Sequence, residues 1–145
     1  MTDDDVRGRA VPIESIDGEV RVYRRHPNGG GMVDVTATVA DGAAVHRSAY
    51  VESGAVLGEG THVGPGCWIE SDVTIGASVT VGQNAHVGAG SRVGDGARIG
   101  ANARIGACAD VAPGARVALD ARVADRHVVL GGRRRAPRSD FETAA

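Results

Sequence analysis

Aliphatic side chains recur at every sixth position through most of this chain. The series begins at Val33 and runs for 17 consecutive positions, all Val, Ile or Leu, without one insertion. Its members are Val33, Val39, Val45, Val51, Leu57, Val63, Ile69, Ile75, Val81, Val87, Val93, Ile99, Ile105, Val111, Val117, Val123 and Val129. An uninterrupted period of six indicates a repeat protein in which each repeat is a short structural unit.

Two other positions of each hexad are also restricted. Four residues after the aliphatic residue the side chain is small, most often Ala. Three residues after it come types that tolerate positive φ: Gly42, Gly54, Gly60, Gly66, Gly90, Gly96, Gly114, Asn84, Asn102, Asp72 and Asp120. In a strand the small residue and the next aliphatic residue, two positions later, point the same way. Each hexad therefore predicts a short strand and a corner.

Three corners close a triangular coil of 18 residues, and successive coils stack about 4.8 Å apart through parallel strand pairing. The fold class is all-β, a parallel β-helix of about five and a half coils over residues 33–130. Residues 1–32 are expected to form an N-terminal cap: a disordered start, a β-hairpin over residues 8–25 and a Gly-rich loop. Residues 131–145 are expected to be a mobile, Arg-rich tail. The pattern of side-chain sizes fails at Arg126 and His127.

Composition excludes some classes of function. All 16 basic residues are arginine, so lysine-based covalent chemistry is ruled out. The net charge of −2 gives no reason to expect nucleic acid as a partner. The start of the chain lacks the apolar stretch of a signal peptide, and no apolar run is long enough to cross a membrane. We therefore expect a cytoplasmic protein.

The hexads Val93 to Arg98 (VGDGAR) and Ile99 to Arg104 (IGANAR) resemble the hexapeptide-repeat superfamily. The resemblance covers about two thirds of the chain. It implies that the β-helix is left-handed, a point that the period alone does not give. It is specific for the fold and unspecific for function.

Outward residues 18 apart in sequence lie directly over one another, which builds columns on each face of the prism. One column contains Tyr50, Trp68, His86, Arg104 and Arg122, and Glu52 and Glu70 belong to the column beside it. Glu70 then lies diagonally across from His86, within reach of its side chain, and Trp68 lies directly beneath the imidazole. A carboxylate that orients a histidine is the arrangement of a general base.

Acyltransferases of this superfamily use a histidine base at the cleft between subunits of a trimer, with coenzyme A along the β-helix. The resemblance therefore implies His86 as the catalytic base and Glu70 as its orienting partner. It also implies Arg104, Arg122 and Trp68 as residues that bind acetyl-CoA or another acyl-CoA. A homotrimer is expected, and the small residues Gly58, Gly76 and Gly94 make another face flat enough for subunit packing. The acceptor would be a small molecule.

Two further readings stay open. His46 and His62 lie on adjacent coils and are the candidates for a metal site. The carbonic anhydrases of the superfamily use three histidines, and the spacing here does not match theirs, so no metal is expected. The other reading is a non-catalytic structural or assembly module. It is favoured by the unbroken hexads, since enzymes of the family often extrude a loop from one coil to build the substrate pocket.

Overall fold

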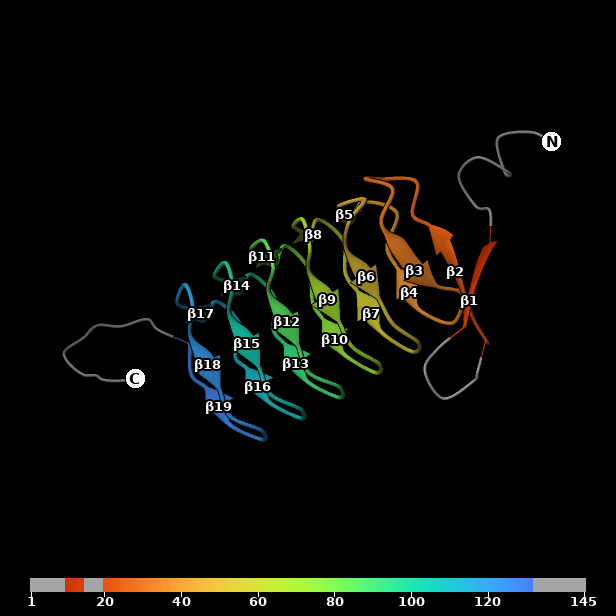
Figure 1. Ribbon diagram of the computed structural model, residues 1–145. Coiled ribbons are helices and arrows are strands. Elements are labelled where there is room, and N and C mark those ends of the chain that lie inside the picture. Colours follow the sequence, from red (N-terminus) through yellow and green to blue (C-terminus); the bar gives the residue numbers. More distant parts are fainter. Residues whose placement is uncertain (1–9, 15–19, 132–145) are drawn as a thin grey trace.

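The computed structural model describes residues 10–14 and 20–131, and within these it is an all-β solenoid with parallel coils. Figure 1 shows the coils stacked in chain order, from the hairpin at one end to β17–β19 at the other. Each complete coil contributes one strand to each of three sheets. The fold predicted from the period of six is confirmed. In the described residues no helix is long and apolar enough to span a membrane.

Sheet 1 has eight strands and carries the N-terminal hairpin. In spatial order they are β1 (Ala10–Glu14), β2 (Val20–Arg25), β3 (Met32–Asp34), β6 (Tyr50–Val51), β9 (Trp68–Ile69), β12 (His86–Val87), β15 (Arg104–Ile105) and β18 (Arg122–Val123). β1 and β2 are antiparallel, as are β2 and β3, and every later pair is parallel. The predicted hairpin is present, and it covers the edge of β3 that the first coil would otherwise leave unpaired.

Sheets 2 and 3 are entirely parallel. Sheet 2 consists of β4 (Thr38–Val39), β7 (Val56–Leu57), β10 (Thr74–Ile75), β13 (Arg92–Val93), β16 (Asp110–Val111) and β19 (Val128–Val129). Sheet 3 consists of β5 (Ala44–Val45), β8 (His62–Val63), β11 (Thr80–Val81), β14 (Arg98–Ile99) and β17 (Arg116–Val117). In both sheets, paired residues are 18 apart in sequence, as predicted.

The core is a stack of thin layers of aliphatic and small side chains. The column Val51, Ile69, Val87 and Ile105 on sheet 1 is fully buried, at 0–1% exposure. Burial of each such side chain contributes roughly 1.5–3 kcal/mol before conformational entropy is counted. Because every layer needs its neighbours to exclude water, the coils stabilise one another.

The corners adopt the left-handed conformation that their residue types predict. Positive φ occurs at each corner from Gly54 to Arg126: Gly54, Gly60, Gly66, Asp72, Ser78, Asn84, Gly90, Gly96, Asn102, Cys108, Gly114, Asp120 and Arg126. Gly42 was expected to share this conformation, but it is not among the residues with positive φ. At the far end, the loss of the size pattern does not end the coil. Arg126 still forms a corner, and Asp110 N donates to His127 O at 2.9 Å.

The expected tail over residues 131–145 lies, apart from Gly131, outside the described residues, as does the start of the chain over residues 1–9.

Candidate functional site

Three consecutive strands of sheet 1 place the candidate site. Trp68, His86 and Arg104 occupy the same position of β9, β12 and β15, and they are directly paired across the strands. In a parallel sheet such residues are about 4.8 Å apart and project from the same face. The strand register therefore brings the column together, as the spacing of 18 residues predicted.

His86 Nε2 and Glu70 Oε2 form a hydrogen bond, which is also an ion pair when the imidazole is protonated. The two side chains are partly shielded from solvent, with 25% and 29% of their surfaces exposed. Since Nε2 contacts a carboxylate, the neutral ring carries its proton on Nε2, which leaves Nδ1 as the proton acceptor. The diagonal offset of 16 residues predicted this contact.

Trp68 lies against His86 on the side of the preceding coil. The two rings are stacked, with centroids 4.8 Å apart and planes 24° from parallel. Trp68 Nε1 donates a hydrogen bond to Glu52 Oε2 at 2.8 Å. Glu52 precedes Trp68 by 16 residues, the same offset that joins Glu70 to His86. The sequence therefore contained the signal for this second diagonal pair, although it was not predicted.

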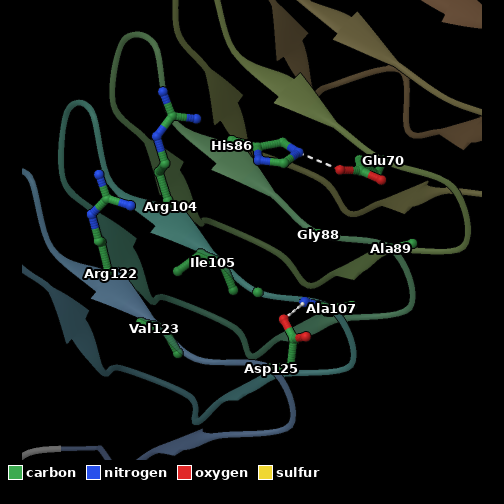
Figure 2. A pocket seen from close by; sticks show the side chains of 11 residues that line it. Glu70, His86, Gly88, Ala89, Arg104, Ile105, Ala107, Arg122, Val123 and Asp125 are labelled. Carbon is green, nitrogen blue, oxygen red and sulfur yellow. Dashed lines mark hydrogen bonds and ion pairs between the residues drawn. The ribbon is translucent and has the colours of Figure 1, made fainter.

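A cleft of about 360 Å³ begins at Glu70 and His86 and extends along sheet 1 toward its last strand. Arg104 and Arg122 line it, with Gly88, Ala89, Ile105, Gly106, Ala107, Val123 and Asp125. Figure 2 shows the two arginines on one side of this cleft and Asp125 on the other, with the His86–Glu70 pair at its head. Trp68 does not line the cleft.

Arg104 and Arg122 are the two arginines among the residues that line the cleft. Arg104 and Arg122 are exposed and directly paired on β15 and β18. Neither forms an ion pair with another residue in the described part of the chain. The residues at the diagonal offset from them are Gly88 and Gly106 instead of glutamates. Their guanidinium groups are therefore available to an anion.

Asp125 on the opposite wall was not predicted. Its Oδ1 accepts a hydrogen bond from Ala107 N at 2.9 Å, one coil earlier. Asp95 makes the same bond to Ala77 N on another corner, also 18 residues earlier and at 2.9 Å. An Asp two residues after an aliphatic position is the signal that both share. The bond fixes the Asp125 carboxylate at the corner that bounds the cleft.

His46 and His62 both bond within their own corners. His62 Nδ1 lies 3.1 Å from Gly60 O, and His46 Nδ1 lies 2.9 Å from Ser48 Oγ. Among residues 10–14 and 20–131, no group of three or more His, Cys, Asp or Glu side chains could hold a metal ion. The two histidines thus have no third ligand in this part of the chain.

Neither cysteine belongs to the cleft, and both are free thiols. Cys67 is buried at an inward small-residue position, where its Sγ lies 2.8 Å from Gly82 O. Burial raises the pKa of the Cys67 thiol, with hydrogen bonds from backbone groups opposing the shift. Cys67 is therefore a core residue, as its position in the hexad predicted, and Cys108 lies exposed at a corner.

Comparison with known proteins agrees with the repeat. Residues 60–95 and 72–107 match the family model described as bacterial transferase hexapeptide (six repeats). A search of curated proteins finds no match.

Three solved structures are similar to this chain. The acetyltransferase domain of PglB from Neisseria gonorrhoeae, in complex with acetyl coenzyme A, is 25% identical over 66% of this chain and 49% of that chain, with a TM-score of 0.38. A hexapeptide transferase family protein from Anaplasma phagocytophilum is 20% identical over 66% of this chain and 70% of that chain, with a TM-score of 0.44. PerB from Caulobacter crescentus, in complex with CoA and GDP-perosamine, is 24% identical over 66% of this chain and 48% of that chain, with a TM-score of 0.36.

The chain spans about half the length of the first and third of these structures. The family match lies within the coils that carry Trp68, His86 and Arg104. The family match over residues 60–107 agrees with the repeat pattern and the solenoid: these coils are built from hexapeptide repeats.

Proposed function

We propose that this protein is a CoA-dependent acyltransferase in which His86 is the general base. The observation that carries the proposal is the His86–Glu70 pair at the head of a cleft that is also lined by the cations Arg104 and Arg122. A base with a fixed tautomer, next to an anion-binding wall, suits transfer from an acyl thioester to a hydroxyl or an amine.

In the proposed reaction, His86 Nδ1 removes the proton from the acceptor O–H or N–H. The acceptor lone pair attacks the thioester carbonyl carbon and forms a tetrahedral intermediate. When this intermediate collapses, the C–S bond breaks and the sulfur leaves with the bonding electrons. The imidazolium returns its proton to that sulfur, which yields free CoA and the acylated acceptor. Glu70 stabilises the imidazolium through Nε2–H while the charge is present.

Arg104 and Arg122 would hold the phosphates of acyl-CoA, the co-substrate. They are neighbours on paired strands, about 4.8 Å apart along the sheet. That spacing suits two adjacent phosphates, since guanidinium groups form charge-assisted and often bidentate hydrogen bonds with phosphate. Neither arginine would have to leave an ion pair in the described part of the chain in order to bind. Trp68 would contribute through His86, because it does not line the cleft.

A homotrimer is part of the proposal. The cleft of one protomer is a groove on the outside of the prism, and a second copy could close it against solvent. Sheet 2 offers the small residues Gly58, Gly76 and Gly94 beside its strands, where another subunit could approach closely. Sedimentation of the purified protein measures the assembly directly, and a monomeric mass would contradict this part of the proposal.

A structural or assembly module is the second candidate function. The observation that favours it is the unbroken run of hexads from Val33 to Val129, in which no coil extrudes a loop. On this reading the sheet 1 column is a surface feature with no bound substrate. The two candidates differ in whether the protein consumes acyl-CoA.

The test is release of the CoA thiol from acetyl-CoA, measured with a thiol-reactive chromophore in the presence of a panel of amines and alcohols. The proposal predicts acceptor-dependent thiol release that His86→Ala abolishes. A rate equal in His86→Ala and the wild-type protein would refute the assigned site. No release with any acceptor, together with no binding of acetyl-CoA, would favour the structural module.

A further inference from the structure

Trp68 is held on two sides although almost half of its surface is exposed. It is the single tryptophan of the chain, at 47% exposure. Its ring stacks on His86, and its Nε1–H donates to Glu52 Oε2 at 2.8 Å. An exposed indole with no partner would sample several rotamers. The stack and the hydrogen bond together select one orientation.

Glu52 is itself fixed by the N-terminal hairpin. Its second oxygen, Oε1, accepts a hydrogen bond from Tyr23 Oη at 2.6 Å. Tyr23 belongs to β2, is only 4% exposed and packs edge-on against Tyr50, with ring centroids 5.7 Å apart. Each oxygen of Glu52 therefore has a donor, one from the hairpin and one from the column beneath His86.

We infer that Glu52 is a positioning residue for His86 and acts through Trp68, an inference that rests on the proposed function of His86 as the base. The contacts form one continuous series: Tyr23 to Glu52, Glu52 to Trp68, Trp68 to His86, and His86 to Glu70. The hairpin that caps the solenoid thus also fixes the surface on which the imidazole lies.

Two physical effects give this arrangement a role in the chemistry. Glu70 fixes one edge of the imidazole, and a fixed indole plane limits rotation of the ring about that hydrogen bond. The indole face also attracts the positive charge that His86 gains when it takes a proton, as in a cation–π pair. A carboxylate that accepts the indole N–H increases the electron density of the ring, which strengthens this attraction. Both effects are lost if Trp68 can rotate away.

Fluorescence of Trp68 tests the positioning without any activity assay. A protonated imidazole stacked on an excited indole accepts an electron from it and quenches its emission. We expect wild-type emission to fall on acidification, once the imidazole carries its second proton. His86→Ala should abolish the fall. That result would assign the quenching to His86 and not to the other charged groups nearby, Glu52, Glu70 and Arg104.

Glu52 is then tested by a pair of variants and a matched control. Glu52→Ala should lose most of the acid-dependent quenching, and Glu52→Gln should restore it, because an amide oxygen can still accept the indole N–H. Glu59→Ala removes an exposed glutamate from another corner and should behave like the wild-type protein. Unchanged quenching in Glu52→Ala, with circular dichroism showing an intact fold, would overturn the inference.

The catalytic consequence is measured separately. Glu52→Ala should lower kcat roughly tenfold, with KM for acetyl-CoA unchanged, because misplacement of a catalytic group lowers the rate of the chemical step. An equal kcat in Glu52→Ala and the wild-type protein would also overturn the inference. If the wild-type protein releases no thiol, the proposed function fails, whereas the fluorescence result still decides whether Glu52 positions His86.

Discussion

Sheets 1 and 3 present a similar column of outward-facing positions, but the residues around the two columns differ. In both, a histidine is followed by two arginines in later coils. On sheet 1 the column is His86, Arg104 and Arg122, and on sheet 3 it is His62, Thr80, Arg98 and Arg116. Both histidines also have a titratable residue 16 positions before them, at the diagonal.

The residue at that diagonal distinguishes the two sheets. On sheet 1 it is Glu70, which bonds His86, and Trp68 stacks beneath the ring. On sheet 3 it is His46, and both His46 and His62 bond within their own corners instead of to each other. A carboxylate offers a neighbouring histidine a negatively charged acceptor that orients its ring. A second histidine offers no such acceptor. The carboxylate at the diagonal and the indole beneath the ring therefore separate a candidate base from a surface histidine.

The largest expected difference between the two sheets is the loss of catalytic rate when the histidine of each is removed in a separate variant. His86→Ala should lower kcat by roughly 10²–10⁴-fold, the usual contribution of a general base. His62→Ala should leave the rate of thiol release within experimental error of the wild-type protein, because His62 has no carboxylate partner. Steady-state kinetics with acetyl-CoA and a responsive acceptor measures both. Equal losses of catalytic rate in His86→Ala and His62→Ala would show that the two histidines do not differ in catalytic role.

Core substitutions should affect both sheets alike. Ile69 on sheet 1 and Ile99 on sheet 3 are 0% and 2% exposed. Truncation of either to Ala should lower the free energy of unfolding by about 2–5 kcal/mol, since a cavity remains in a close-packed layer. Chemical denaturation measures the change, and the matched exposed substitution Thr80→Ala should have little effect. A much smaller cost for Ile99→Ala would show that the two sheets are not equivalent in packing.

Exchange of the diagonal residue sharpens the comparison. Glu70→His gives sheet 1 the residue found at the diagonal of sheet 3, and it should lower kcat roughly tenfold, a part of the general-base contribution. Glu70→Gln keeps an acceptor oxygen but not the charge, so its loss of kcat should be smaller than that of Glu70→His. His46→Glu on sheet 3 serves as the control and should leave kcat unchanged. A fully active Glu70→His variant would show that the His86–Glu70 pair has no catalytic role.

The smallest expected effect is the contribution of the cysteines to the pH dependence of stability. Burial raises the pKa of Cys67 above its ordinary value of 9.0. The unfolded chain therefore loses this proton at a lower pH than the folded protein. Cys67 should then not change the free energy of unfolding with pH near neutrality. Its contribution to the free energy of unfolding should decline as the pH rises above 9.0. Unfolding experiments on wild-type protein and Cys67→Ala across that range measure it.

Alkylation provides a second measurement on the same pair. At pH 8 an alkylating reagent should modify exposed Cys108 first and leave Cys67 protected until the fold opens. Mass spectrometry of peptides counts the two products. Modification of Cys67 at the rate of Cys108 would contradict its place in the core.

The repeat made the fold and part of the site predictable. A strict period of six fixes which residues share a column, so the contacts of Trp68, His86 and Glu70 follow from offsets of 18 and 16 residues. Asp125 and Glu52 obey the same offsets and could have been found in this way. Tyr23 could not, because it belongs to the antiparallel hairpin, whose register against the first coil is set by pairing of β2 with β3 and not by the repeat. The conformation of Gly42 was also missed, since residue type alone does not decide φ.

Binding of acetyl-CoA to the purified protein, measured by titration calorimetry, tests the central claim most directly. We expect saturable binding that Arg104→Ala weakens by at least roughly tenfold, the loss expected for one charge-assisted hydrogen bond. Arg98→Ala, the matched substitution on sheet 3, should bind as tightly as the wild-type protein. Equal weakening by the two variants, or no binding to a folded protein at millimolar acetyl-CoA, would contradict the claim that sheet 1 carries an acyl-CoA site.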